Sequence, residues 1–256
     1  MATGTLPISV CMATHNGGRF LREQVESILP QLAPGDELVV SDDASTDDTL
    51  AILASYADPR LKVLAGNVFH SPVRNFENTL RHARGAILVL CDQDDCWLPG
   101  RLELVRERLA GNAGRVALIM MDGELVDASG NPLGGTIFER NRVGTGWLKN
   151  IYDNTYTGCC LAFSRPLLDM ALPFPDKIPM HDVWLGLLAE TFGQVEFIPV
   201  RTIRHRRHGE NASFRATNRL LQISRRVRLV LYLAARCARI ICLRRLITSS
   251  RKAHEL

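Results

Sequence analysis

The sequence lacks the cysteine patterns that mark disulfide frameworks and structural zinc sites. It has seven cysteines, an odd number, with no CxxC pair and no Cys/His spacing typical of a zinc site. Residues 1–7 include no basic region, and the apolar stretch 8–12 is too short for a signal sequence. These absences favour a reducing compartment, and we expect a cytoplasmic protein.

Acidic residues are nearly absent from the last part of the chain. Residues 215–256 hold 11 of the 31 Lys and Arg but one of the 27 Asp and Glu, a net charge of +10, whereas the rest carries −6. An acidic body with a basic tail predicts chemistry in the body and attachment to an anionic surface through the tail. Nucleic acid and anionic lipid are the two candidate surfaces.

The body reads as one globular α/β domain. The 256 residues are 46% hydrophobic and 23% charged, with no internal repeat and no long linker. Apolar runs alternate with helical patterns, which predicts a parallel sheet whose loops gather at one edge. The expected strands are 8–13, 37–41, 61–64 and 86–91, and the expected helices are 19–32, one that Thr46 or Asp47 caps, and 73–83.

The second half is less regular. We expect strands at 116–121, 156–163 and 195–200, and a helix at 181–192. The segment 136–156 has no clear period, so we interpret it as a mobile loop that contacts an acceptor.

Three carboxylates follow the apolar run 87–91 directly: Asp92, Asp94 and Asp95. Like charges so close together persist in a cleft by binding a divalent metal, by sharing protons or by pairing with basic groups. Oxygen ligands favour Mg2+ or Mn2+, which neutralises a diphosphate and so suggests a nucleotide-linked substrate. The alternative is an exposed acidic turn.

Several short motifs occur in an order and spacing that resemble inverting family 2 glycosyltransferases with a GT-A fold, most like bacterial rhamnosyltransferases. The resemblance covers roughly residues 6–212. It implies a Rossmann-like, mostly parallel sheet flanked by helices, a nucleotide-sugar donor, a divalent metal and a saccharide acceptor. The motifs are Thr14-His15-Asn16-Gly17, Ser41-Asp42-Asp43-Ala44-Ser45-Thr46-Asp47, Asp92-Gln93-Asp94-Asp95-Cys96-Trp97, Thr157-Gly158, His181-Asp182-Val183-Trp184 and Arg207-His208-Gly209-Glu210-Asn211.

The resemblance also assigns roles to residues. Asp182 takes the place of the catalytic base, with His181 supporting it. The metal would be held by Asp94, Asp95 and His208. The donor would be bound by Asp42, Asp43, Arg74, Asp92 and Arg207.

Each assignment has a simpler alternative. The loop 42–47 and Asp182 could serve simply as helix caps. Arg74 could form a surface salt bridge, and His208 could be a solvated surface residue. Trp97 could line the donor cleft or pack in the core. Two departures from the family pattern weaken the transfer: His205 stands where relatives often carry Tyr, and Ala13 where a Thr that contacts the donor can occur.

The tail has the pattern of a basic amphipathic helix. Arginines interrupt each apolar run well short of the roughly 20 residues needed to span a bilayer, so we expect the helix to lie on an anionic membrane surface. Packing on the body or on a second copy is the alternative. The apolar face is formed by Leu220, Ile223, Val227, Val230, Leu231, Ala234, Ala238 and Ile241.

Together these features predict a glycosyltransferase domain at 1–214 and a membrane-associated tail at 215–256. We expect transfer of L-rhamnose from dTDP-rhamnose, or of a hexose from a UDP-sugar, to a lipid-linked saccharide acceptor in cell-surface polysaccharide synthesis. We expect no nucleic-acid partner. The rival hypotheses are a sugar nucleotidyltransferase, which would need a glycine-rich basic phosphate loop that is missing here, and a noncatalytic adaptor.

Overall fold

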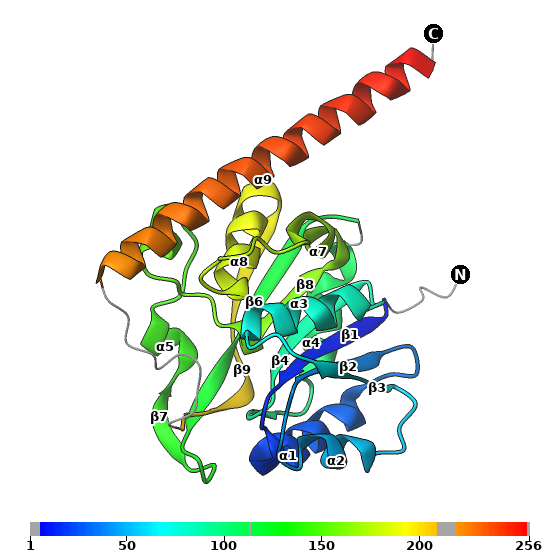
Figure 1. Cartoon of the computed structure of the whole chain (residues 1–256), viewed down its shortest axis with the longest axis vertical. Coiled ribbons are helices and arrows are strands. Elements are labelled where there is room, and N and C mark those ends of the chain that lie inside the picture. The colour runs from blue at the N-terminus through cyan, green and yellow to red at the C-terminus, as the bar shows by residue number, and fades with distance from the viewer. Residues whose placement is uncertain (1–5, 113, 209–218, 255–256) are drawn as a thin grey trace.

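One mixed sheet organises the described part of the chain. The computed structural model describes residues 6–112, 114–208 and 219–254. The strand order is β3-β2-β1-β4-β8-β6-β9-β5, with β7 paired to β6 (Figure 1). The strands are β1 (Ile8–Thr14), β2 (Glu37–Asp43), β3 (Leu61–Asn67), β4 (Ile87–Asp92), β5 (Cys96–Trp97), β6 (Ala117–Val126), β7 (Pro132–Thr136), β8 (Leu161–Ser164) and β9 (Gln194–Arg206).

The expected α/β architecture is confirmed, and parallel pairing runs through β3, β2, β1 and β4. Beyond β4 the sheet becomes mixed, because β8 pairs antiparallel with both β4 and β6. Thr14 is opposite Asp42, and Ala13 is opposite Asp92. The two acidic loops therefore leave the sheet at the same edge, as the alternation of strands and helices predicts.

Helices pack against the sheet, with α3 against β1 and β2 (Figure 1). The start of α3 is fixed locally, because the Ser71 hydroxyl accepts a hydrogen bond from the Arg74 N–H and Pro72 occupies the first turn. The helices are α1 (Gly18–Ile28), α2 (Thr49–Ala54), α3 (Pro72–His82), α4 (Arg101–Leu109), α5 (Ile137–Asn141), α6 (Trp147–Tyr152), α7 (Arg165–Ala171), α8 (His181–Phe192) and α9 (Arg219–His254).

The segment 136–156 is not the irregular loop that we expected, since it contains α5 and α6. Thr136 and Glu139 form a reciprocal capping box at the start of α5. Glu190 on α8 then accepts hydrogen bonds from Asn150 of α6 and from the Tyr156 hydroxyl. A Thr-x-x-Glu cap is readable in the sequence, but the Glu190 contacts join residues 34 and 40 positions apart.

The last strand is also longer than expected. We predicted a strand at 195–200, whereas β9 runs to Arg206 alongside β6. This extension carries residues 205–208 back to the edge of the sheet where Asp92 lies.

Helix α9 lies across α6 and α8 and extends past the body (Figure 1). Leu229 and Leu233 of α9 are buried, and the Arg236 guanidinium donates to the backbone carbonyls of Met170, Leu172 and Pro173. No helix in the described part of the chain is long and apolar enough to cross a bilayer. The expected boundary at 214/215 lies outside the described residues.

Candidate active site

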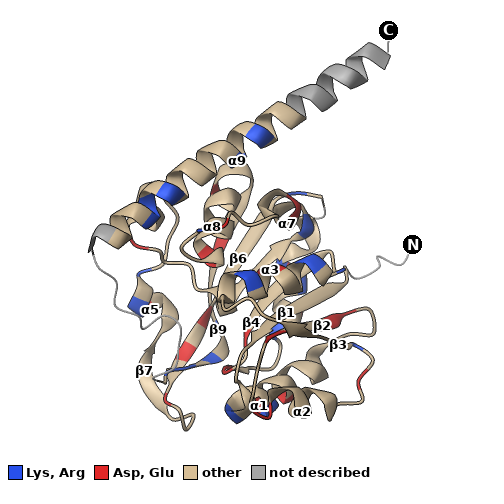
Figure 2. Ribbon diagram, viewed as in Figure 1, with Lys and Arg blue, Asp and Glu red and all other residues tan. Residues whose placement is uncertain are grey.

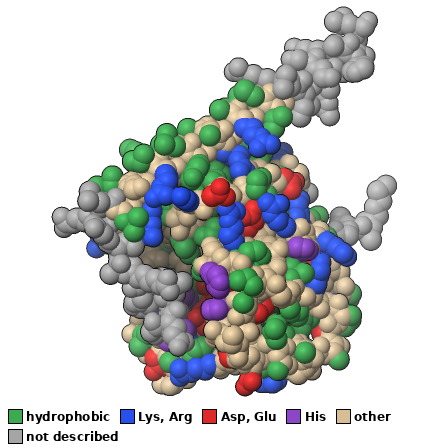
Figure 3. Space-filling model, in the orientation of Figure 1, with side chains coloured by type: hydrophobic (Ala, Val, Ile, Leu, Met, Phe, Trp, Pro, Cys, Tyr) green, Lys and Arg blue, Asp and Glu red, His purple; other side chains and the backbone are tan. Residues whose placement is uncertain are grey.

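The three carboxylates of the loop after β4 gather at one point. Oxygen atoms of Asp92, Asp94 and Asp95 lie within 4.8 Å of one another. Asp95 is fully buried and Asp94 nearly so. The alternative of an exposed acidic turn is therefore wrong. Figure 3 shows acidic and histidine side chains together where this face of the molecule is hollowed.

Burial and mutual repulsion shift the pKa values of this cluster. Burial, with the charges of Asp95 and Asp94, raises the pKa of Asp92 to about 8. Burial and the charge of Asp95 also raise the pKa of Asp94. Burial acts to raise the pKa of Asp95 too, but the charge of His205 outweighs it, and the pKa is lowered. The raised pKa values show how strongly these carboxylates repel one another when ionised, a repulsion that a bound cation would relieve.

The end of β9 supplies basic groups to the same cluster. Nε2 of His208 lies 2.8 Å from Oδ2 of Asp94, and Nδ1 of His205 lies 3.0 Å from Oδ1 of Asp95. Burial lowers the pKa of His205, but Asp95 more than compensates and raises it to about 9. The backbone N–H of Arg206 donates to Asp95, and its Nε donates to the carbonyl of Asp94. His208 therefore lies where we expected it, beside the acidic loop.

These residues fit a divalent metal. Three carboxylates form the hard oxygen donor set that Mg2+ or Mn2+ prefers, with the borderline imidazole nitrogen of His208 beside it. Oδ2 of Asp95 is buried and has no hydrogen-bond partner among the described residues. A buried carboxylate oxygen without a partner costs free energy that a bound cation would recover.

Two residues of this site were not singled out from the sequence. The Gln93 side chain accepts from the backbone N–H of His15 at 2.8 Å and donates to the carbonyl of His15 at 3.1 Å. A Cβ on Gly17 would lie 2.3 Å from Oε1 of Gln93, so only glycine allows this approach. Gln93 therefore fixes the metal loop to the loop that follows β1. The motif Asp-Gln-Asp-Asp contained the signal, but its partner is 78 residues away.

Asp42 and Asp43 lie at the edge of the sheet, but their carboxylates are occupied by protein groups. Asp42 accepts from the hydroxyls of Thr14 and Ser45 and from the Ser45 N–H. Asp43 accepts from the backbone N–H groups of residues 69–71. Both carboxylates therefore stabilise loops around the cleft. This role is structural, like the helix capping weighed as the alternative, although the partners are loop residues. Their contact with a donor stays a prediction.

Helix α2 begins at Thr49, later than expected. The Asp47 carboxylate accepts from the Thr49 N–H and also from the Gly18 N–H. Asp47 thus joins the starts of α1 and α2 across the edge of the sheet, where we expected it to cap one helix.

Arg74 forms the ion pairs that were its alternative role. Its guanidinium contacts Glu77 and lies 2.6 Å from Asp176, and it donates to the carbonyl of Phe174. These contacts attach α3 to the segment before α8. Arg207 immediately precedes His208 in the sequence, and its backbone N–H donates a hydrogen bond to the carbonyl of Val126. Donor binding by either arginine stays a prediction.

Asp182 is in the first turn of α8 and faces the same cleft. Its Oδ1 accepts from Asn154 Nδ2 at 3.2 Å and from the Val183 N–H at 2.6 Å. Burial raises its pKa to about 6. Its neighbour His181 packs against Gly158, and the next residue, Cys159, has its Sγ 3.7 Å from Nδ1 of His205. These contacts connect the start of α8 to the acidic cluster. A carboxyl group with this pKa is matched to taking up a proton near neutral pH.

His181 and Trp97 are both core residues. Both ring nitrogens of His181 are buried without a partner among the described residues, and burial lowers its pKa to about 3. Its ring packs on Phe76 at 4.2 Å between centroids. Trp97 is buried, with the Arg101 guanidinium 4.6 Å above its ring. Of the two roles weighed for Trp97, core packing is correct.

Comparison with known proteins decides the family. A profile of Glycosyl transferase family 2 matches residues 9–169, more than half of the chain. The chain belongs to glycosyl transferase family 2. The matched residues include both acidic loops of this family 2 enzyme, whereas Asp182 and His208 lie beyond the match.

Two bacterial proteins illustrate the similarity of this glycosyltransferase to its relatives. A Bacillus subtilis (strain 168) protein described as a teichuronic acid biosynthesis glycosyltransferase, TuaG, is 33% identical over 191 residues, which are 72% of this chain and 73% of TuaG. The Escherichia coli UDP-Glc:alpha-D-GlcNAc-diphosphoundecaprenol beta-1,3-glucosyltransferase WfgD is 24% identical over 72% of this chain and 70% of its own.

A solved structure supports the fold. S. aureus TarS 1-349, crystallised in complex with UDP-GlcNAc, superposes with a TM-score of 0.66 and 21% sequence identity. The superposition covers 83% of this chain and 62% of the TarS chain. The GT-A fold that the motifs imply is therefore confirmed.

Proposed function

We propose that this family 2 glycosyltransferase transfers a sugar from a nucleoside diphosphate donor to a saccharide hydroxyl, with inversion at the anomeric carbon. The observation that carries the proposal is the acidic cluster, whose three carboxylates have oxygen atoms within 4.8 Å of one another. Support for Asp182 comes from its burial on α8 and from its neighbour His181, which packs beside Gly158, next to the Cys159 that contacts His205. One cleft then combines a carboxylate able to accept a proton with a cluster able to hold the cation of a diphosphate.

In the proposed reaction Asp182 is the base. The acceptor oxygen attacks the anomeric carbon while the Asp182 carboxylate takes its proton, and the bond from that carbon to the diphosphate oxygen breaks. The hydrogen bonds from Asn154 and the Val183 N–H hold the carboxylate in one orientation. We assign Asp94, Asp95 and His208 to an Mg2+ or Mn2+ ion, which would supply positive charge to the departing nucleoside diphosphate. Donor binding is assigned to Asp42, Asp43, Arg74, Asp92 and Arg207.

The donor is proposed to be a UDP-hexose or dTDP-L-rhamnose. The name of WfgD, which includes UDP-Glc, and the UDP-GlcNAc complex of TarS support the first candidate. The Asp-Gln-Asp-Asp-x-Trp motif, which resembles rhamnosyltransferases, supports the second. Sugar selection depends on the shape of the pocket, so it requires measurement.

The acceptor is proposed to be a lipid-linked saccharide in cell-surface polysaccharide synthesis. Support comes from the name of WfgD, which includes a diphosphoundecaprenol acceptor, and from that of TuaG, which refers to teichuronic acid. We propose that residues 1–214 form the catalytic domain and that residues 215–256 hold it at the inner face of the cell membrane.

A donor panel tests the catalytic proposal. Purified protein is incubated with UDP-, dTDP- and GDP-sugars in Mn2+, Mg2+ or EDTA, and donor hydrolysis and thermal shift are measured. We expect hydrolysis of one donor class that requires the metal, and an NMR spectrum of a transfer product with the anomeric configuration inverted. Pyrophosphate release would instead indicate a nucleotidyltransferase, and retained configuration would contradict inversion.

A further inference from the structure

Helix α9 contacts the body with one face and exposes the apolar face that the sequence predicted to lie on a membrane surface. Leu233 is 0% exposed, whereas Leu231, two residues earlier, is 61% exposed. Four exposed apolar side chains between Ile223 and Leu231 recur at intervals of three or four positions, and Ile241 follows Val230 by eleven positions, about three turns, so these five form one stripe along the helix. Figure 3 shows hydrophobic side chains along the outer side of α9. The large exposed members of the stripe are Ile223, Val227, Val230, Leu231 and Ile241.

Helix α6, which contacts α9, adds exposed apolar and aromatic side chains next to this stripe. Leu148 is 85% exposed and Tyr152 is 72% exposed, and Trp147 is partly exposed next to them. The Arg226 guanidinium joins the two helices, because it donates to the carbonyl of Tyr152 at 2.6 Å and lies 4.4 Å from the centre of the Tyr152 ring. Tryptophan and tyrosine with exposed leucine are typical of protein surfaces at the level of lipid headgroups.

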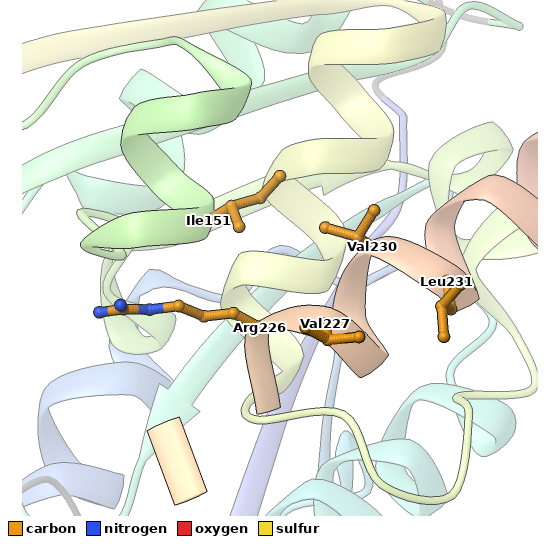
Figure 4. Close-up of a pocket in the computed structure, with 5 residues that line it drawn as sticks. All are labelled: Ile151, Arg226, Val227, Val230 and Leu231. Atoms are coloured by element: carbon orange, nitrogen blue, oxygen red, sulfur yellow. The ribbon is translucent and has the colours of Figure 1, made fainter. Parts of the chain in front are cut away.

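A shallow apolar pocket lies where the two helices meet. It has a volume of about 330 Å3 and is lined by Ile151 from α6 and by Arg226, Val227, Val230 and Leu231 from α9 (Figure 4). Only one of its five lining residues is charged, and no other element in the described ranges lines it. The pocket makes α6 and α9 one continuous apolar surface.

Positive charge borders this surface. The helical period places Arg226 and Arg228 on the two flanks of the apolar stripe, with Arg225 and Arg239 farther round the helix. The described side chains of α9 include no carboxylate (Figure 2). Anionic headgroups next to a hydrocarbon layer complement this arrangement. A second copy packed by twofold symmetry would instead bring the same arginines together, and their repulsion disfavours it.

We propose that α6 and α9 together form a docking surface for an anionic lipid bilayer, with Leu148, Tyr152 and the exposed stripe of α9 inserted among the headgroups. The inference rests on the membrane association proposed above, and it adds α6 to the contact. Because α9 is docked on α6 and α8, the catalytic body is held against the bilayer in a fixed orientation. The catalytic residue Asp182 is on α8, one of the helices that α9 contacts.

Vesicle co-sedimentation of the full chain tests this surface without any donor or acceptor. We expect the protein to bind vesicles of phosphatidylglycerol and phosphatidylcholine, and to bind pure phosphatidylcholine at least about tenfold more weakly. The double substitution Val227→Glu/Leu231→Glu should reduce binding at least about tenfold, and Leu148→Glu alone about threefold or more. The matched control is Leu133→Glu, which changes an exposed leucine of β7 and should leave binding unchanged.

Donor hydrolysis by the same preparations separates this proposal from the catalytic one. Vesicle binding without hydrolysis would leave the docking surface intact and contradict the proposed reaction. The docking proposal is overturned by no binding to anionic vesicles, by equal binding of the double variant, or by equal binding of Leu148→Glu. A dimer seen by light scattering that the double variant loses, in protein that binds no vesicles, would assign the surface to a second copy.

Discussion

The cleft and helix α9 break the usual rule of burial in opposite directions. The cleft buries carboxylates that would be more stable in water, and α9 exposes Val and Leu side chains that would be more stable inside. Each arrangement costs stability that a bound group would restore: a cation in the cleft and a lipid surface on α9. Functional surfaces are commonly found where the sequence and the folded structure conflict in this way.

The largest expected effect is at the proposed base. Asp182→Asn keeps the shape of the side chain but removes its ability to take a proton, so kcat should fall by roughly 10³-fold. Asp169→Asn, an exposed change on α7, is the control and should leave kcat unchanged. Steady-state transfer kinetics measure both variants. A loss of less than tenfold would remove Asp182 from the role of base.

The acidic cluster should show the next largest effect. Asp94→Ala removes the carboxylate that contacts His208, and kcat/KM should fall by about 10²-fold or more. His208→Ala should raise the Mn2+ concentration needed for half-maximal activity by about 10- to 100-fold, because a contact to the metal loop is lost. Metal titration of activity measures both effects. An unchanged metal requirement in both variants would contradict the assigned metal site.

Several features of the cleft could be predicted from the sequence because they depend on local pattern. Apolar runs that end in Asp42 and Asp92 predicted strands that deliver carboxylates to one edge, and the register confirms it. The apolar face of α9 was also readable from its helical period. These predictions need only the direction of side chains along one element.

The partners of the polar groups could not be predicted, because they are chosen by tertiary contacts. Arg74 contacts Asp176, 102 residues away, and His205 contacts Asp95, 110 residues away. The docked face of α9 was equally hidden, since the buried Leu229 and Leu233 were not among the residues of the predicted apolar face. Helix α4 was missed, although Leu102, Val105 and Leu109 have helical spacing after Pro99-Gly100.

A matched pair of substitutions on α9 tests the difference between its two faces. Leu233→Ala should destabilise the docking of α9 by about 2–4 kcal/mol, because a fully buried side chain leaves a cavity. Leu231→Ala should change it by less than about 0.5 kcal/mol, since that side chain is exposed. Hydrogen exchange of the α9 amides measures the free energy of opening. Equal effects of the two substitutions would mean that α9 is not docked as described.

The last expected effect is a difference in pH dependence between catalysis in the cleft and vesicle binding by α9. Asp182 has a pKa raised to about 6 by burial, so kcat/KM should fall about tenfold per pH unit below pH 6 as the base becomes protonated. The same shift makes the contribution of Asp182 to folding stability decrease as pH rises through this range, because the folded protein binds the proton more tightly than the unfolded chain. Arginines do not titrate here, so vesicle binding should stay constant between pH 5.5 and 8, by rough estimate. If vesicle binding fell together with kcat/KM below pH 6, the loss of activity would reflect a change in the whole molecule and not protonation of Asp182.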